Sequence, residues 1–69
     1  MNFSFYSNEA NEPVHIHISK GDGVAKYWLD PDVIEEYSYG FKVKERRDVK
    51  ILVNEHSKFL WDKWHEYFS

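Results

Sequence analysis

Apolar and polar residues alternate along the first part of the chain, a pattern that predicts β-strands. A short alternation covers residues 2–5, and a longer one covers residues 14–19, where three aliphatic residues alternate with two histidines and a serine. Pro13 has no N–H for a strand ladder, so the second strand is expected to begin there. The sequence Gly21-Asp22-Gly23 predicts a hairpin turn, and a third strand follows over residues 24–29.

The hairpin register determines which side chains share a face. A two-residue loop at Asp22-Gly23 would place Ile18 opposite Tyr27 and Ile16 opposite Leu29. The other face would then carry the pairs Ser19 with Lys26, His17 with Trp28, and His15 with Asp30. A slip by one residue would mix apolar and polar side chains on both faces, which the burial of one face forbids. We therefore predict an apolar face for the core and a polar face that contains both histidines.

The segment after this hairpin is compatible with two structures. Asp30-Pro31-Asp32 resembles a helix N-cap with proline at the first helical position. Residues 33–39 fit either a short helical turn or an extended edge strand, and Gly40 is expected to end the segment.

The C-terminal part of the chain has helical periodicity over residues 43–68. One stripe of spacing three or four contains Val49, Leu52, Val53, His56, Leu60, Trp64 and Tyr67. A single helix of this length would extend about 37 Å, and a break near residues 54–57 is the alternative. Trp61 and Phe68 fall outside the stripe, where they either widen the buried face or contact a partner.

These elements predict one α+β domain over residues 1–69, with strands and turns in residues 1–40 and helix in residues 41–69. The expected architecture is a small antiparallel sheet of three to four strands with one long C-terminal helix packed on its apolar face. The aromatic residues expected in the core are Phe3, Phe5, Tyr27, Phe59, Trp64 and Tyr67.

Composition adds two constraints to this picture. The 69 residues include no cysteine, so neither a disulfide nor a thiolate ligand or nucleophile is available. Three Trp, five Tyr and five Phe make up 19% of the chain, and such large side chains let a small core bury enough surface. Because this number exceeds what one small core needs, we expect the surplus to form an interface with a protein partner or a second copy.

Charge is distributed unevenly along the chain. Residues 1–39 carry a net charge of -5, residues 40–50 carry +3, and residues 51–69 carry -1. The pI near 5.7 does not favour general nucleic-acid binding. The local basic cluster either is a solvated helix start or binds phosphate or an acidic partner. It contains Lys42, Lys44, Arg46, Arg47 and Lys50.

His15 and His17 are the main candidates for chemistry, because alternate strand positions place their imidazoles about 6–7 Å apart on one face. They could act as acid and base on a phosphodiester, with Lys26 neutralising the phosphate. They could also bind a metal ion that Asp30 completes. In the third interpretation both are half-exposed, and His17 packs on Trp28.

The sequence lacks the motifs of several large enzyme classes. It contains no nucleophile elbow, P-loop, zinc-protease helix motif or dinucleotide-binding fingerprint, and no cofactor is expected. No stretch approaches the about 18 apolar residues of a membrane helix, and the N-terminal residues do not resemble a signal peptide. A cytoplasmic location is therefore expected.

Four strings carry a resemblance to a known family: F-Y-S-N-E at residues 5–9, E-P-V-H-I-H-I at 12–18, A-K-Y-W-L-D-P at 25–31 and W-H-E-Y-F at 64–68. The chain resembles the small prokaryotic proteins of the family known as domain of unknown function 4160. Members usually have Pro at the position of Val14, Ser near Lys42, and Asn at the positions of His56 and His65. Without that Ser, Glu45 forms only half of a capping box, and the helix start is expected to fray.

The resemblance implies no activity, but it implies a setting. Members are short proteins that are often encoded beside another small protein, in arrangements similar to toxin–antitoxin pairs. We therefore expect a partner-binding module, with a small metal-independent phosphodiesterase or ribonuclease that uses His15, His17 and Lys26 as the alternative. The residues expected to contact a partner are Trp28, Asp30, Lys42, Lys44, Arg46, Arg47, Trp61 and Phe68.

Overall fold

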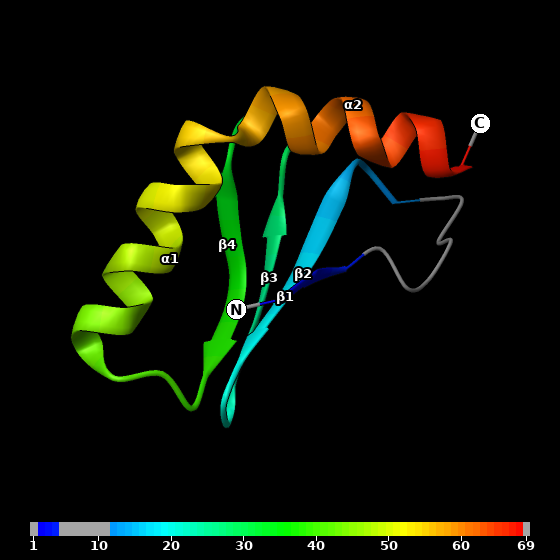
Figure 1. The fold of residues 1–69 in the computed structure, drawn as a ribbon. Coiled ribbons are helices and arrows are strands. Elements are labelled where there is room, and N and C mark those ends of the chain that lie inside the picture. The colour runs from blue at the N-terminus through cyan, green and yellow to red at the C-terminus, as the bar shows by residue number, and fades with distance from the viewer. Residues whose placement is uncertain (1, 5–11, 69) are drawn as a thin grey trace.

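The computed structural model describes residues 2–4 and 12–68, apart from the side chains of Phe3 and Phe68. Its strands are β1 (Asn2–Ser4), β2 (His15–Lys20), β3 (Gly23–Trp28) and β4 (Ile34–Tyr39), and its helices are α1 (Val43–Glu55) and α2 (Ser57–Phe68). The strands form one antiparallel sheet in the order β1-β2-β3-β4. Figure 1 shows α1 beside β4 and α2 running across one end of the sheet. The α+β class and the small antiparallel sheet are confirmed.

The β2–β3 hairpin turns one residue earlier in the chain than the sequence predicts. Its two loop residues are Gly21 and Asp22, so that Lys20 pairs with Gly23 and Ile18 with Ala25. Gly21 has a φ of 56°, a left-handed conformation that glycine adopts without a steric penalty. The predicted cross-strand partners are therefore wrong by two residues. The predicted division into an apolar and a polar face still holds, because side chains alternate with a period of two.

At Gly23, the first residue of β3, the neighbouring Phe41 ring leaves no room for a side chain. A Cβ at this position would overlap the ring atoms of Phe41, far inside van der Waals contact. The close approach of the Phe41 ring therefore requires glycine here, and this requirement is not visible in a turn pattern.

Residues 33–39 form a strand rather than a helical turn, since β4 covers Ile34–Tyr39. The β3–β4 pairing is irregular: Lys26 pairs with Tyr37 and Tyr27 pairs with Glu35, so Glu36 is an extra residue in β4. Gly40 ends the strand as expected, with a φ of 77°. A Cβ there would overlap the Asp22 carbonyl oxygen, so Gly40 lies directly against the hairpin loop.

The prediction of one long C-terminal helix is wrong, because the helix is divided at His56. His56 has φ -109° and ψ 14°, and its backbone still links the helices: its N–H donates to the Leu52 carbonyl, and its own carbonyl accepts from the Leu60 N–H. A straight helix of about 37 Å would extend well past strands of six residues, which measure about 20 Å. The break lets both helices contact the sheet. It also leaves His56 exposed, so its predicted burial is wrong.

The start of α1 has the incomplete cap that the sequence predicts. A Glu45 carboxylate oxygen accepts a hydrogen bond of 3.0 Å from the Lys42 backbone N–H. The Lys42 side chain carries only N–H donors, so it cannot accept a hydrogen bond from the Glu45 backbone N–H. Only half of the capping box therefore forms. Fraying of this end stays a prediction.

The core lies between the helices and one face of the sheet. Its buried members are Val14, Ile16, Ile18, Ala25, Tyr27, Leu29, Val49, Val53 and Leu60, with Val33, Phe41 and Trp64 packed at the margin. Tyr27 and Trp64 are thus placed as predicted. Phe59 and Tyr67, also predicted in the core, are exposed. The stripe continues past the break through Leu60 and Trp64 only, and Phe59 lies outside it. Phe5 and the Phe3 side chain lie outside the described residues. Among the described residues, no helix is long and apolar enough to cross a membrane.

Candidate functional site

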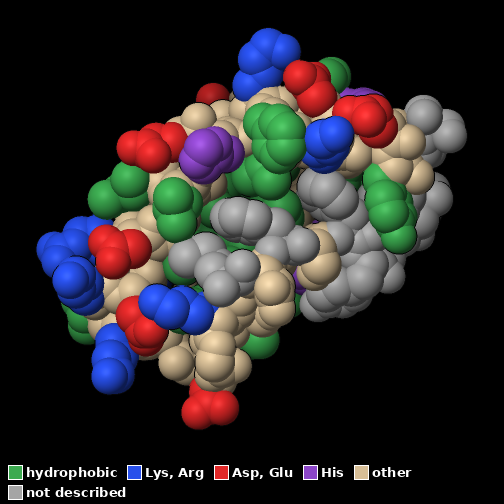
Figure 2. Space-filling view, in the orientation of Figure 1, with side chains coloured by type: hydrophobic (Ala, Val, Ile, Leu, Met, Phe, Trp, Pro, Cys, Tyr) green, Lys and Arg blue, Asp and Glu red, His purple; other side chains and the backbone are tan. Residues whose placement is uncertain are grey.

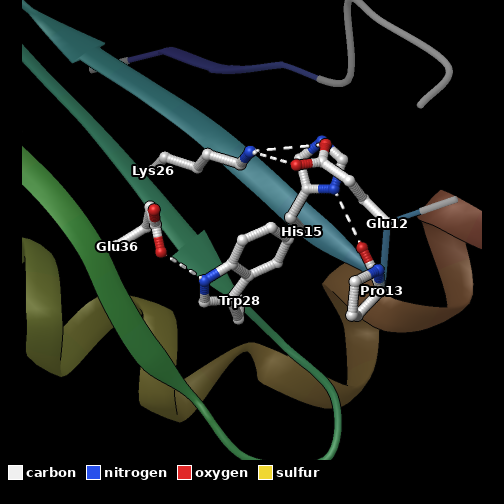
Figure 3. Close-up of polar contacts among 6 residues, drawn as sticks. All are labelled: Glu12, Pro13, His15, Lys26, Trp28 and Glu36. Carbon is white, nitrogen blue, oxygen red and sulfur yellow. Dashed lines mark hydrogen bonds and ion pairs between the residues drawn. The ribbon is translucent and has the colours of Figure 1, made fainter.

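The face of the sheet opposite the core carries the histidine cluster, which we define as Glu12, His15, His17, Lys26 and Trp28. The hairpin pairs His15 with Trp28 and His17 with Lys26, so β2 and β3 bring these four side chains to one face. Glu12 approaches from the segment before β2 (Figure 3). The His15 and His17 rings lie 5.3 Å apart, edge to face, close to the separation expected for alternate strand positions.

His15 is held by its own chain and by its neighbours. Its Nδ1 donates a hydrogen bond of 2.9 Å to the Pro13 carbonyl oxygen, which can only accept, so Nδ1 carries the proton. Nε2 then lies 4.0 Å from a Glu12 carboxylate oxygen. The edge of the ring faces Trp28, with 5.5 Å between ring centroids. With 1% of its surface exposed, His15 is buried in the sheet.

Lys26 is a buried cation with two close neighbours. Its Nζ donates to both Glu12 carboxylate oxygens, at 3.1 and 3.4 Å, and lies 4.4 Å from the centroid of a Trp28 ring (Figure 3). A charge with 8% exposure needs such compensation, because burial removes the water that would otherwise solvate it. Lys26, His15 and His17 also make contacts in addition to these.

Trp28 connects the cluster to β4. Its indole N–H donates a hydrogen bond of 2.7 Å to a Glu36 carboxylate oxygen, so the extra residue of β4 supplies the acceptor (Figure 3). The predicted packing of His17 on Trp28 is replaced by contact between His15 and Trp28, as the register shift requires.

The arrangement limits the chemistry of the cluster. Asp30 is not opposite His15 as predicted: it follows the end of β3 and is exposed. Within the described part of the chain, no three His, Asp or Glu residues are placed to hold a metal ion. The histidines are not half-exposed, since His17 exposes 9% of its surface, and Lys26 already neutralises Glu12. A phosphodiester would have to displace these contacts to reach either imidazole.

The basic cluster lies on α1 and the residue before it. Lys42, Lys44, Arg46 and Arg47 are all exposed. Figure 2 shows Lys and Arg side chains at the α1 side of the molecule, mixed with acidic ones. The cluster is therefore less uniformly positive than its sequence indicates.

Arg46 bridges α1 to β4. Its guanidinium donates to both carboxylate oxygens of Glu35, with Nε–Oε1 at 3.0 Å and Nη2–Oε2 at 2.6 Å. The hydrogen bonds and positive charge of Arg46 lower the pKa of Glu35 below its ordinary value. On the same side of the sheet, burial and then the negative charge of Glu35 raise the pKa of Tyr27 to about 12.

The aromatic edge of α2 is only partly open. Trp61 exposes 38% of its surface, and its ring lies 3.9 Å from that of His65, one helical turn later. Trp64 instead turns inward and approaches His15, with ring centroids 6.3 Å apart. The Phe68 side chain lies outside the described residues. Trp61 is therefore the described part of the predicted aromatic contact surface.

The family model of a domain of unknown function, DUF4160, matches residues 1–65. The chain belongs to the DUF4160 family. Comparison with curated proteins and with solved structures gave no significant match. The family resemblance drawn from the sequence strings is thus confirmed, and membership in DUF4160 assigns no activity.

Sequence reasoning missed one surface of this DUF4160 protein, the outer side of β4. The strand carries two exposed apolar side chains, Ile34 and Tyr39, and one carboxylate, Glu36, that is exposed and bound to Trp28. A signal was available: residues 27–39 contain four acidic residues and no basic one. The uncertainty between helix and strand for this segment concealed that these residues share an edge.

Proposed function

We propose that this protein is a binding module that associates with a second protein, as one half of a toxin–antitoxin-like pair. The supporting observation is a contrast in burial. The polar side chains that could perform chemistry are buried and bound to one another, whereas large apolar side chains are exposed.

Among the described residues, eight large apolar side chains are at least 38% exposed. They are Val24, Ile34, Tyr39, Val43, Ile51, Phe59, Trp61 and Tyr67. Single exposed apolar side chains are common, but Tyr and Trp are the types that dominate binding energy at interfaces. Side chains of these types gain stability when a partner covers them.

The remaining predicted contact residues extend this proposal. Trp28 and Asp30 lie on the β3–β4 side of the molecule, and Lys42, Lys44 and Arg47 would face an acidic region of the partner. Phe68 stays a predicted contact. We further propose that the pair acts in the cytoplasm and that nucleic acid is not its main target, given the net charge of -3.

Co-expression with a small protein encoded beside this one, the arrangement that the family resemblance implies, tests the proposal. A tagged copy of this protein should retain that small protein through purification, and sedimentation should give the mass of a complex. Replacing Tyr39 and Trp61 with Ser should weaken the complex by about tenfold or more, since each is an exposed aromatic. Lys58→Ser, at a side chain that is 89% exposed, is the matched control and should change binding by less than about twofold. A strict monomer that retains no partner would contradict the proposal.

The alternative function, a phosphodiesterase or ribonuclease that uses His15 and His17, is less consistent with their burial. An RNA-cleavage assay separates the two proposals. We expect the unmodified protein and a folded His17→Asn variant to give the same amount of RNA cleavage. If the unmodified protein cleaves RNA, and His17→Asn abolishes the cleavage without changing the circular dichroism spectrum, the enzyme would be favoured.

A further inference from the structure

The outer edge of β4 is open in the part of the chain that the structure describes. There, β4 pairs with β3 on one side only, because the sheet order ends at β4 (Figure 1). An antiparallel edge strand directs about half of its backbone N–H and C=O groups outward. Those groups can accept a further strand. α1 lies beside β4, and its Arg46 contacts Glu35, which shares the core face of the sheet with Tyr27.

β4 and the loop that leads into it are acidic. Glu35 and Glu36 lie on β4, Asp30 and Asp32 lie in the loop before it, and residues 27–39 contain no Lys or Arg. Arg46 neutralises Glu35, while Asp30, Asp32 and Glu36 remain exposed carboxylates. Four carboxylates outnumber the two cations of α1 that act on Glu35, Arg46 and Lys50, so this stretch has a net negative charge and attracts a strand that carries Lys or Arg.

Aromatic side chains lie beside these carboxylates. The rings of Tyr37 and Tyr39 stack with centroids 5.5 Å apart and an interplanar angle of 27°. Tyr39 is 66% exposed and lies opposite Val24, which is 45% exposed. Tyrosine faces bind guanidinium and ammonium groups. On the neighbouring strand, Lys26 already makes this type of contact with Trp28.

We propose that the β4 edge accepts an extended, basic segment of the partner protein as a fifth strand of the sheet. In this segment, Lys or Arg side chains would alternate with β-branched ones, so that the cations meet the carboxylates and tyrosines of β4 while the backbone completes the ladder. This inference rests on the proposed partner-binding function and names the chemistry of the partner.

A second copy of the same chain fits the edge poorly. Two β4 strands brought edge to edge would place several carboxylates near one another, and like charges on paired strands are unfavourable. A basic segment would instead be attracted to these carboxylates.

Hydrogen exchange and peptide binding test the inference directly. The probe is a capped synthetic peptide in which Lys and Arg alternate with Val, compared with a version that has Glu in place of the cations. A third version, N-methylated at alternate residues, keeps the charge but cannot complete the ladder. We expect the basic peptide alone to protect the backbone amides of residues 34–39 from exchange.

A pair of matched variants separates the β4 site from general charge attraction. Asp32→Asn with Glu36→Gln removes two charges from the edge, and the amide oxygen introduced by Glu36→Gln is expected to remain an acceptor for the Trp28 indole. Asp48→Asn with Glu55→Gln removes two exposed charges from α1. We expect the first double variant to weaken peptide binding about three- to tenfold and the second to change it less than about twofold.

Equal weakening in both double variants, or binding that leaves the β4 amides unprotected, would overturn the inference. If the neighbouring gene product binds without protecting β4, the inference fails and the proposed function stands. If the basic peptide protects β4 but no partner protein is retained in co-expression, the edge behaves as inferred and the proposed function fails.

Discussion

At the scale of single residues, Lys26 shows how the histidine cluster is held together. Its ammonium group is almost fully buried and depends on the Glu12 carboxylate 3.1 Å away. The same carboxylate is 4.0 Å from the imidazole of His15. A buried charge that loses a counter-ion is destabilised, because burial has removed the water that would otherwise solvate it. The cluster therefore joins the segment before β2 to β3.

Removing the Glu12 charge should destabilise the fold. We expect Glu12→Gln to lower the free energy of unfolding by about 1–2 kcal/mol, less than for a fully buried pair because the Glu12 side chain is 30% exposed. Urea denaturation at pH 7 measures the change. Asp62→Asn removes the partner of the exposed Lys58 and should change stability by less than about 0.5 kcal/mol. Equal effects of the two substitutions would contradict a compensating role for Glu12.

Arg46 should affect stability in a pH-dependent way. Because Arg46 lowers the pKa of Glu35 from its ordinary value of 4.5, the ionised Glu35 stabilises the folded state above that value. This contribution is lost as the pH falls through the lowered pKa of the folded state. We therefore expect Arg46→Met to be less stable than the unmodified protein at pH 7, and the difference to shrink in strongly acidic solution. Denaturation at a series of pH values tests this, and a constant difference would exclude the Glu35–Arg46 pair as its source.

At the scale of elements, two glycines with positive φ allow the hairpin loop to turn and β4 to end beside it. Gly21 has a positive φ with open space around its Cα, whereas Gly40 has a positive φ and also lies against the Asp22 backbone. The two positions therefore differ in what a side chain would encounter. A side chain at position 21 would meet only the cost of the left-handed conformation. A side chain at position 40 would meet that cost and would also overlap the Asp22 backbone.

Alanine substitutions should reveal this difference. We expect Gly21→Ala to cost about 1 kcal/mol of unfolding free energy, the usual penalty of a left-handed conformation for a residue with a Cβ. Gly40→Ala should cost about 3 kcal/mol or more, because its Cβ would overlap the Asp22 carbonyl, which is backbone and cannot rotate away. Thermal denaturation ranks the two variants. Similar losses would mean that the contact at Gly40 relaxes without cost.

Sequence periodicity predicted the strands and their faces but not their exact pairing. The alternation around Ile16 and Ile18 determines which side chains are buried, and this survives a shift of two residues. The register depends on the fit of Gly23 under Phe41, a contact between residues that are distant in sequence. The helix break near residues 54–57 was predicted as an alternative. The exposure of Phe59 and Tyr67 was not, because it depends on the orientation of α2 after His56, which periodicity does not give.

Strand alternation correctly grouped four residues of the candidate site, but it wrongly added Asp30 and did not reveal the contact with Glu12 or the burial of the site. The H-x-H spacing correctly placed His15 and His17 side by side on the face that also carries Lys26 and Trp28. Their burial could not be predicted, because alternation identifies a polar face without showing what covers it. The roles proposed for these residues and the single-domain organisation stay predictions.

At the scale of the whole molecule, charges of opposite sign gather on different elements. The start of α1 carries exposed cations, whereas β4 and the loop before it carry exposed carboxylates, with stacked tyrosines on β4. The exposed aromatic side chains of β4 and α2 are of the types enriched at interfaces. This distribution supports the partner binding that we propose.

Hydrogen exchange of the co-expressed pair tests the partner-binding account most directly. Compared with the protein alone, the complex should show increased protection in the backbone of residues 34–39, while the strand that carries His15 and His17 should change little. Unchanged exchange throughout β4 in a complex of confirmed mass, or protection confined to the histidine strand, would contradict the account.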